Sequence, residues 1–356
     1  MNPAAPTTLP AGTQRLPAAD LEALLQNGAA AWKALAGRRI FLTGGTGFFG
    51  RWLLEAIWHA NAFAGLGIRV TVLTRDPAEF HRRAPDLTAV PWLTLSAGDI
   101  RTFALPGERF DCVIHAAAPV VARVAPADLR EALEEGTRRT LDFAVACGAS
   151  RFLLTSSGAV YGRQPPDILQ VTEDYAGAPV PGEPGSAYGE GKRAAEQLCA
   201  ACREAHGLDC MIARCFAFVG PHLALDAHFS IGNFIRDALQ GRPIRIAGDG
   251  TALRSYLYAS DLVVWLLAVL TRGEPLRPYN IGSEHALSIA ELAGRVRTVL
   301  NVTMPIELAT TARPGARPQP YVPSVARIQR ELGVQQTVDL NTAIRRTAEW
   351  NLSRPL

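Results

Sequence analysis

The chain of 356 residues lacks the long apolar runs and basic clusters of membrane and nucleic-acid-binding proteins. Its longest strongly apolar run, Leu262 to Leu270, has nine residues, whereas a membrane-spanning helix needs about 20. The N-terminal segment has no basic start followed by an apolar stretch, so it does not resemble a signal peptide. Charged residues make up 19%, the net charge is +3, and no arginine-lysine run occurs. We expect a soluble cytoplasmic protein that binds neither nucleic acid nor membrane.

The six cysteines form no convincing metal or redox pattern. Cys199 and Cys202 make a C-x-x-C pair, and Cys210 and Cys215 follow with His206 between, so a zinc or redox site is one interpretation. However, the first two lie on a predicted helix and the others in or beside the next strand, where cysteine often packs as a small apolar residue. We expect packing and no metal site.

Apolar segments alternate with helical patterns along the first two thirds of the chain. Strands are expected at 38–43, 68–73, 91–96, 112–115, 151–155 and within 208–218, and helices at 20–35, 49–62, 127–147 and 188–206. This alternation predicts an α/β fold with a doubly wound (Rossmann) parallel sheet.

The pattern changes after about Pro221, where prolines and arginines become frequent. We expect a flexible tail over 1–17, an N-terminal helix and Rossmann domain over 18–220, and a smaller C-terminal mixed α/β substrate-binding region over 221–356. A strand near 279–282 would complete the sheet. Residues 164–186, rich in proline and glycine, are predicted to form a loop over the site.

A glycine-rich turn lies at the first strand-to-helix junction, where a doubly wound sheet binds a dinucleotide. Glycine lets the backbone turn sharply beside a pyrophosphate, and the helix N-terminus offers free N–H groups. The alternative is an ordinary glycine-rich turn. The residues assigned to the cofactor are Gly44, Thr46, Gly47, Phe48, Phe49 and Gly50.

The ends of the next strands add further candidates for cofactor binding. Arg75 could meet the 2′-phosphate of NADP, whereas Asp76 could bond the ribose of NAD, so both cofactors stay open with NAD slightly favoured. Asp99, followed by Ile100, could bond the adenine amino group or could cap a turn. Small residues at Ala116, Ala117 and Ala118 would let the cofactor lie close to the backbone, and His115 is expected to be a packed core histidine.

Ser157, Tyr188 and Lys192 are the candidate catalytic residues. Tyr188 and Lys192 are four residues apart, so they share one face of a helix. The lysine would lower the tyrosine pKa and bind the cofactor ribose, and Tyr188 would take the hydroxyl proton of an alcohol as hydride leaves its carbon. Ser157 would bind the same oxygen. Ser156 is the alternative for that role, but the spacing to Val160-Tyr161-Gly162 favours Ser157.

With these motifs in order, the chain resembles an extended short-chain dehydrogenase/reductase of the NAD-dependent nucleotide-sugar epimerase/dehydratase family. The resemblance runs from about Arg38 to near the C-terminus. The segments that carry it are 43–50, 155–162, 188–192, 214–221, 248–250 with 254–256, 279–283 and 313–315.

The resemblance implies a tightly held NAD or NADP and a nucleotide-diphosphate sugar as substrate. It also implies a homodimer packed through the helices near 127–147 and 188–206. By motif position Arg254 would bind the diphosphate, with Arg313 and Asn233 as helpers, and Arg242 is a further candidate. Arginine suits a diphosphate because it makes paired, charge-assisted hydrogen bonds; the alternative for each arginine is a solvated surface charge.

The departures from the family argue against dehydration and decarboxylation, and they fit both a 4-epimerase and a sugar 4-ketoreductase. In the family's 4,6-dehydratases an acidic pair follows the catalytic serine or threonine, and uronate decarboxylases carry a glutamate at the second of these positions. Here the two positions are Gly158 and Ala159, and Ala217 replaces a frequent asparagine. We expect an epimerase acting at C4 through a transient 4-keto sugar. The alternatives, in order, are an NADPH-dependent 4-keto-6-deoxy sugar reductase, a dehydratase or decarboxylase, and a dinucleotide sensor without enzymatic activity.

Overall fold

The computed structural model describes residues 14–105, 107–118, 125–183, 185–227, 229–313, 315 and 317–353. Residues 1–13 of the predicted tail and Pro314 of the segment 313–315 therefore lie outside the described residues.

A seven-stranded parallel sheet forms the centre of the molecule, with the order β11-β6-β5-β4-β1-β2-β3. The order reverses direction between β1 and β4, which defines the point where doubly wound sheets bind ligands. The predicted Rossmann fold is confirmed. The strands are β1 (Arg39–Thr43), β2 (Arg69–Thr74), β3 (Leu93–Ala97), β4 (Cys112–His115), β5 (Arg151–Ser157), β6 (Asp209–Cys215) and β11 (Pro278–Ile281).

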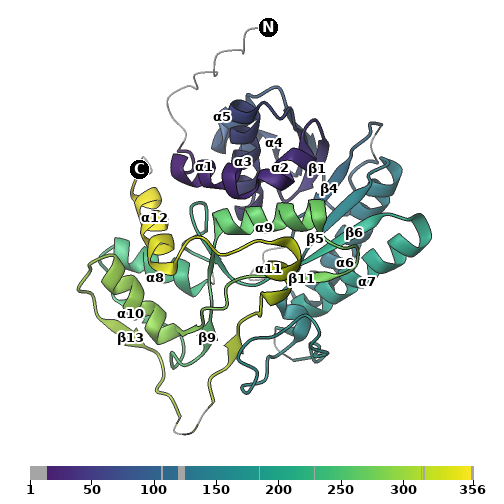
Figure 1. The fold of residues 1–356 in the computed structure, drawn as a ribbon. Coiled ribbons are helices and arrows are strands. Elements are labelled where there is room, and N and C mark those ends of the chain that lie inside the picture. The colour runs from purple at the N-terminus through teal and green to yellow at the C-terminus, as the bar shows by residue number, and fades with distance from the viewer. Residues whose placement is uncertain are drawn as a thin grey trace.

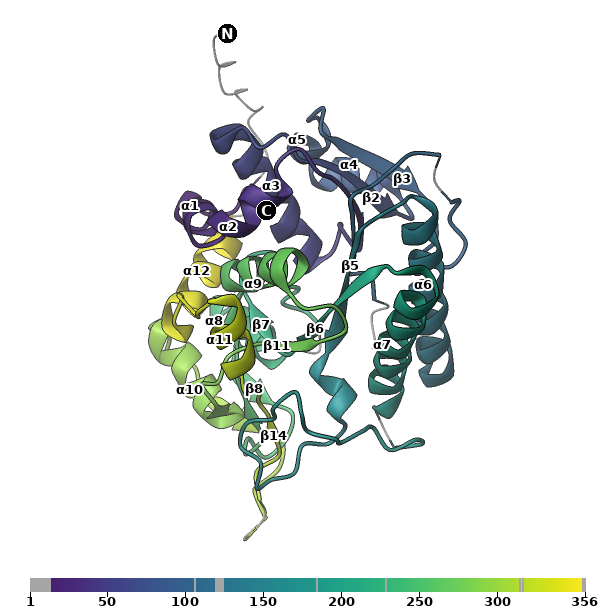
Figure 2. The ribbon, with the colours of Figure 1, turned by 45° about the vertical axis from the view of Figure 1, so that its right-hand side comes forward.

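Helices cover both faces of this sheet. Figure 2 shows the long helices α6 (Pro126–Ala146) and α7 (Ser186–His206) on one side of the sheet, with α3 (Phe48–Ala64) and α9 (Ala259–Arg272) on the other. The short helices α4 (Pro77–Arg83) and α5 (Pro85–Thr88) lie near β3, and the 3₁₀ turn η2 (Gly158–Tyr161) follows β5.

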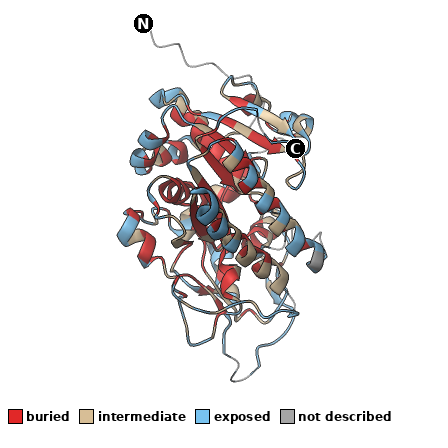
Figure 3. Cartoon of the chain, turned by 90° about the vertical axis from the view of Figure 1, so that its right-hand side faces the viewer, coloured by how far each residue is buried: buried red, intermediate tan, exposed pale blue. Residues whose placement is uncertain are grey.

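Strand alternation divides the apolar residues into two cores. Ile40 and Leu42 belong to the core under α3 and α9, whereas Phe41 points into the core under α6 and α7, as the period of two along a strand requires. Figure 3 shows buried residues concentrated in the central strands and on the inner sides of helices. Cys199 and Cys210 lie in the second core, consistent with the expected packing role.

The C-terminal region contains small sheets and further helices, and much of it lies at the lower left of Figure 1. One sheet has the order β12-β9-β14, and the pairs β10-β7 and β13-β8 are parallel ladders. Their bounds are β7 (Phe218–Val219), β8 (Ile244–Ile246), β9 (Leu253–Arg254), β10 (Leu257–Tyr258), β12 (Leu287–Ser288), β13 (Ile306–Leu308) and β14 (Pro320–Tyr321). In addition to α9, the helices of this region are α8 (Ser230–Leu239), α10 (Ile289–Val299), α11 (Ala326–Leu332) and α12 (Leu340–Leu352).

The N-terminal helix differs from its expected form. The expected helix over 20–35 is two helices, α1 (Ala18–Asn27) and α2 (Ala29–Leu35), separated at Gly28. A Cβ at Gly28 would lie 2.8 Å from the Leu24 carbonyl oxygen, which accepts a hydrogen bond from the Trp32 indole. Leu16, within the predicted tail, is buried and its N–H donates to Glu55 Oε2 at 2.7 Å.

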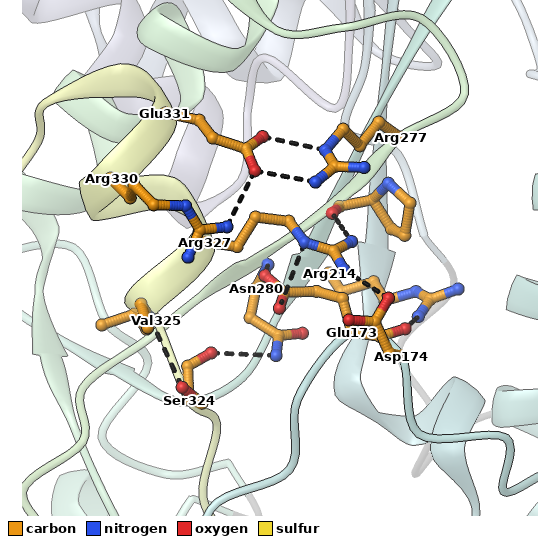
Figure 4. A network of polar contacts seen from close by, with 12 residues as sticks. Glu173, Asp174, Arg214, Arg277, Asn280, Ser324, Val325, Arg327, Arg330 and Glu331 are labelled. Carbon is orange, nitrogen blue, oxygen red and sulfur yellow. Dashed lines mark hydrogen bonds and ion pairs between the residues drawn. The ribbon is translucent and has the colours of Figure 1, made fainter.

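A polar network centred on the buried residues Arg327 and Asn280 joins the C-terminal region to the sheet (Figure 4). Arg327 on α11 donates to the Pro278 carbonyl at 3.1 Å and to Asp174, and lies 3.7 Å from Glu173 Oε2. Asn280 on β11 donates to the carbonyls of Val171 and Ser324. The network therefore connects β11, the loop at 171–174 and the segment after β14.

Within the described part of the chain, no helix combines the length and the apolar character needed to cross a bilayer.

Candidate active site

The parallel sheet brings most of the predicted site residues to one edge. Gly44 follows β1, Arg75 follows β2, Asp99 lies just beyond β3 and Ala116 follows β4, while Ser157 ends β5. Because parallel strands end at the same edge, residues from these distant segments of the chain meet there.

The glycine turn has the geometry of a pyrophosphate cradle. Gly44 has φ +75°, and a Cβ there would lie 2.5 Å from the Ala116 carbonyl. A Cβ at Gly50 would lie 2.3 Å from Gly45 Cα. Gly47 is the N-cap residue of α3 and provides no side-chain hydrogen bond, so the first N–H groups of the helix are available to an anion. The residues present fit a dinucleotide.

The ends of β2 and β3 bear on the choice between NAD and NADP. Arg75 is exposed, whereas Asp76 caps α4 by accepting from the Glu79 N–H at 2.8 Å. Asp99 accepts hydrogen bonds from the N–H and guanidinium of Arg101, both at 3.0 Å, and these bonds lower its pKa. These contacts match the turn-capping alternative for Asp99, and its role toward adenine stays a prediction. The following Ile100 packs against Gly136 of α6.

The end of β4 lies directly against the glycine turn. Ala116 N–H donates to the Thr43 carbonyl and Ala117 N–H to Thr43 Oγ1, both at 3.2 Å, and Ala118 is exposed. His115 is bracketed by the hydroxyls of Thr43 and Thr137, and burial lowers its pKa to about 3. It is a neutral core histidine, as expected.

Ser156 and Ser157 occupy opposite faces of β5, which separates their roles. Ser156 donates to Glu196 Oε1, and Glu196 forms a paired salt bridge with Arg214. Ser157 instead accepts from the Ala159 N–H at 3.1 Å. Burial raises the pKa of the Tyr188 and Tyr321 phenols, and the Ser157 hydroxyl partly opposes this rise. Ser156 is thus engaged by Glu196, and the catalytic role of Ser157 stays a prediction.

Lys192 is buried beside Tyr188, although its ammonium points elsewhere. Its Nζ donates to the Thr155 carbonyl at 2.7 Å and lies 5.8 Å from the centre of the Tyr188 ring. Burial lowers the Lys192 pKa to about 8. We expected the lysine to lower the pKa of Tyr188, but burial raises that pKa above its ordinary value, and the effect of the Ser157 hydroxyl only partly opposes this.

An aromatic pair lies beside Gly158, the residue that follows the candidate catalytic serine. A Cβ at Gly158 would lie 2.6 Å from the Phe216 ring. Phe216 packs on Tyr321 with ring centres 4.8 Å apart.

The predicted substrate-binding residues are only partly brought together. Arg254 lies 5.7 Å from the centre of the Tyr321 ring and donates to the Leu253 and Gln319 carbonyls. In the first turn of α8, the Oδ1 atom of Asn233 is buried and has no hydrogen-bond partner in the described part of the chain. Arg313 is exposed. Arg242 is bound to Asp237 at 3.1 Å instead, and nothing in the described ranges links it to Arg254.

Sequence reasoning missed Tyr321 and Phe216. Tyr321 enters the site because β14 pairs with β9, where Tyr321 lies opposite Arg254. Two-residue strands in an irregular region carry no periodic signal. Phe216 is the residue before Ala217, a position where the sequence departs from the family. An aromatic residue beside that departure was the one signal that could have drawn attention to Phe216.

The fold and the site together define a dinucleotide-binding protein with a serine, a tyrosine and a lysine at the switch point of its sheet. The model of the NAD dependent epimerase/dehydratase family matches residues 40–282. The chain belongs to this family. Because the family is described as NAD dependent, the prediction of a nicotinamide cofactor is confirmed.

Known relatives in the family catalyse different reactions. UDP-glucuronic acid decarboxylase 5 of Arabidopsis thaliana is 30% identical over 315 residues, covering 86% of this chain and 87% of the relative. The structure of DesIV, a dTDP-glucose 4,6-dehydratase from Streptomyces venezuelae with NAD and TYD bound, has a TM-score of 0.74 at 27% identity, covering 88% of this chain and 97% of that one. UDP-N-acetylglucosamine 4-epimerase of Methanobrevibacter ruminantium has a TM-score of 0.76 at 20% identity, over 89% and 99% of the chains, and shows the fold alone.

Proposed function

We propose that this chain is a nucleotide-diphosphate-sugar 4-epimerase. The observation that carries the proposal is the Phe216 ring over Gly158. Elimination of water needs an acid for the leaving hydroxyl and a base for the adjacent proton. The family position for these carboxylates holds Gly158 and Ala159, and the ring leaves no room for a larger residue at the first of them.

The residues of the chain divide the work as follows. The turn from Gly44 to Gly50 and the free end of α3 would hold the pyrophosphate of NAD, and Lys192 would lie near the nicotinamide ribose. When bound, NAD supplies a positively charged ring that takes a hydride from the sugar carbon and returns it. Ser157 orients the sugar oxygen by hydrogen bonding, and Tyr188 accepts and returns its proton.

Charge at the sheet edge prepares Tyr188 for this step. In the described geometry its phenol is neutral, because burial raises its pKa. Lys192 is close enough for its charge to favour a phenolate. A buried, water-poor site strengthens such electrostatic effects.

The substrate diphosphate would be bound by Arg254, with Asn233 and Arg313 beside it. The buried and unpartnered Oδ1 of Asn233 supports this assignment, since buried polar atoms normally have partners. We leave Arg242 out because Asp237 already holds its guanidinium.

A homodimer through α6 and α7 is part of the proposal. These helices pack on each other along one side of the molecule (Figure 2), and their outer residues are exposed. Light scattering coupled to size exclusion would give twice the chain mass, and substitution of Ala200 and Ala201 on α7 by glutamate should give monomers. A monomeric wild type would refute the dimer.

A reductase remains the second candidate. It is supported by Arg75, which is exposed and could meet the 2′-phosphate of NADP, whereas the neighbouring Asp76 caps α4. Such an enzyme would consume NADPH with a 4-keto-6-deoxy sugar nucleotide, using the same Ser157, Tyr188 and Lys192.

Native mass spectrometry followed by a nucleotide-sugar panel read by NMR tests these alternatives. The panel contains UDP-glucose, UDP-N-acetylglucosamine, UDP-glucuronic acid and dTDP-glucose, with a 4-keto sugar nucleotide and NADPH in a separate arm. Bound NAD and inversion at C4 without added cofactor would support the epimerase. Release of carbon dioxide from UDP-glucuronic acid, loss of water from dTDP-glucose, or stoichiometric NADPH oxidation would overturn it.

A further inference from the structure

Glu196 on α7 is a largely buried carboxylate that has no part in the reaction steps proposed above. Its side chain is 13% exposed. Tyr188, Lys192 and Glu196 follow one another at intervals of four residues along α7, so they lie on one face of the helix, one turn apart. The helix therefore places this carboxylate in line with the two candidate catalytic residues.

The partners of Glu196 lie on two neighbouring strands of the sheet. Its Oε1 accepts from the Ser156 hydroxyl and from Arg214 Nε at 3.0 Å, and its Oε2 accepts from Arg214 Nη2 at 2.7 Å. Ser156 on β5 and Arg214 on β6 are opposite each other in the strand pairing. The carboxylate therefore joins the carboxyl ends of both strands, directly before Ser157.

Arg214 extends these contacts to the turn that follows Ser157. Its guanidinium lies 4.8 Å from the centre of the Tyr161 ring, and Tyr161 is the last residue of η2. The residue before Ser157 and the last residue of the turn after it therefore both contact one largely buried ion pair.

Lys192 makes a similar attachment one turn earlier on α7. Its Nζ donates to the Thr155 carbonyl at 2.7 Å, and Glu196 accepts from the next residue, Ser156. Two side chains of α7 thus hold consecutive residues of β5. This double attachment sets how the helix lies along the strand, and with it the position of the candidate catalytic tyrosine relative to the serine that ends the strand. Such support is what a preorganised site requires.

The charge of Glu196 also acts on Lys192. Burial lowers the pKa of Lys192 to about 8, and the groups that oppose this are Cys215, Glu196 and Cys199. Burial raises the pKa of the Cys215 thiol on β6 to about 12, and the pKa of Cys199 is raised by its neighbour Cys210 and by burial. Both thiols are therefore neutral at physiological pH, which leaves the carboxylate as the source of negative charge.

Two further titratable groups close to Lys192 are also neutral. His115 on β4 is uncharged because burial lowers its pKa to about 3. Tyr188, whose ring centre lies 5.8 Å from the ammonium, is uncharged because burial raises the pKa of its phenol. Among these groups Glu196 alone carries a charge, and its sign favours a protonated lysine.

We propose that Glu196 is a positioning residue. Through its hydrogen bond to Ser156 it fixes the strand end that presents the candidate catalytic serine, and its charge favours the ammonium form of Lys192. It acts through these residues and does not itself meet the reacting atoms. For the reaction, this inference rests on the proposed epimerase function, whereas the ionisation of the lysine can be measured without it.

The first test measures the ionisation of Lys192 and needs neither substrate nor cofactor. The chain has only two lysines, Lys33 and Lys192, and Lys33 on α2 is exposed. Protein labelled with ¹³C at lysine Cε therefore gives one resonance for the buried lysine and one internal reference. Glu196→Gln keeps an acceptor oxygen but removes the charge, so the midpoint of the Lys192 titration should fall by about one pH unit. The midpoint for Lys33 should stay in place.

Glu190→Gln is the matched control, because it removes the same charge from α7. Glu190 is two residues before Lys192 and does not face it, and its carboxylate accepts from Ser186 Oγ at 2.6 Å. The control should leave the Lys192 midpoint unchanged. No shift in Glu196→Gln, or an equal shift in both variants, would overturn the proposal. Should Glu196→Gln fail to fold because Arg214 loses its counterion, Glu196→Met combined with Arg214→Met removes the pair, and the same fall is expected.

The second test isolates the serine contact and uses the proposed reaction. Ser156→Ala removes the hydrogen bond to Glu196 but leaves the ion pair, so kcat should fall about 10-fold, with KM within about twofold and NAD still bound. Ser150→Ala is the control: its hydroxyl donates to the Asp111 carbonyl just before β5 begins, and kcat should not change. Wild-type kcat in Ser156→Ala would refute the positioning role.

The pH profile separates the two contacts. Loss of the Lys192 proton weakens its support of the Tyr188 phenolate, so kcat should decline at lower pH in Glu196→Gln than in wild type. In Ser156→Ala the decline should stay at the wild-type pH. A shift in both variants, or in neither, would contradict the role of the Glu196 charge. If the wild type epimerises nothing in the panel, the proposed function fails, while the lysine titration still decides on Glu196.

Discussion

On the sheet side of the candidate site, Ser157, Tyr188 and Lys192 are buried or partly buried, and the serine and lysine are fixed by backbone hydrogen bonds. On the C-terminal side, Arg254 is half-buried at a two-residue strand and Arg313 is exposed. Proton transfer requires a fixed geometry in an environment of low dielectric constant. In such an environment each buried charge lowers the stability of the fold and interacts strongly with its neighbours. A diphosphate can be bound by more solvated cations. We therefore expect sheet-side substitutions to change kcat and stability, and C-terminal substitutions to change KM.

The largest effect should follow removal of the sheet-side phenol. Tyr188→Phe keeps the ring but removes the proton acceptor, so kcat should fall about 1,000-fold, with little change in KM or in bound NAD. Steady-state kinetics and native mass spectrometry would measure this. Retention of full activity in Tyr188→Phe would remove the sheet side from the chemistry and favour a sensor.

A second strong effect should come from the glycine turn. In Gly50→Ala the new Cβ would lie 2.3 Å from Gly45 Cα, a backbone contact that cannot relax without moving the turn. We expect a loss of about 3 kcal/mol in stability together with weaker NAD binding. Thermal unfolding and calorimetric titration would detect both.

Gly294→Ala is the matched control for that substitution. Gly294 lies within α10, and a Cβ there meets no atom within 4 Å. Alanine should stabilise this helix by about 0.8 kcal/mol. If both variants behaved alike, the packing of the turn would not be the cause.

The glycines of the turn, and the serine, tyrosine and lysine of the candidate site, could be found from the sequence because each depends on local geometry. A turn needs adjacent glycines, a strand end delivers Ser157, and one helix face presents both Tyr188 and Lys192. Tyr321 could not be found, because its position depends on the pairing of β14 with β9. The direction of the Lys192 side chain depends on the Thr155 carbonyl, and the partner of Arg242 on how α8 ends. Such contacts are fixed by tertiary packing, so their residues leave no spacing pattern.

Lys192→Met tests whether a buried charge on the sheet side increases activity while it lowers the free energy of unfolding. Activity should fall about 100-fold because a positive charge near the phenolate is lost. The Lys192 pKa of about 8 in the folded chain is below the ordinary value of 10.5, so burial of the charge costs stability at neutral pH. The variant should be more stable by roughly 3 kcal/mol, an order-of-magnitude figure.

The pH dependence of this gain has a definite sign. Between pH 8 and 10.5 the unfolded chain binds more protons at this lysine than the folded chain, so wild-type stability from this group rises with pH there. The advantage of Lys192→Met should be largest below about pH 8 and should shrink as pH rises toward 10.5. Denaturant unfolding at several pH values measures it, and an advantage that grows with pH would show that Lys192 is not buried as a charge.

The smallest effect should come from the C-terminal side, where Arg254→Ala removes one cation from the proposed diphosphate site. KM for the nucleotide sugar should rise about 30-fold, equivalent to about 2 kcal/mol for a charge-assisted hydrogen bond, while kcat changes little. Arg242→Ala removes an arginine that is paired with Asp237 and should leave KM within about twofold, since exposed pairs contribute little. Raising the salt concentration should weaken binding to wild type more than to Arg254→Ala. A fall in kcat without a change in KM would show that Arg254 acts on the chemical step, as the sheet-side residues do. Its guanidinium lies 5.7 Å from the centre of the Tyr321 ring. The expected difference between the two sides of the site would then no longer hold.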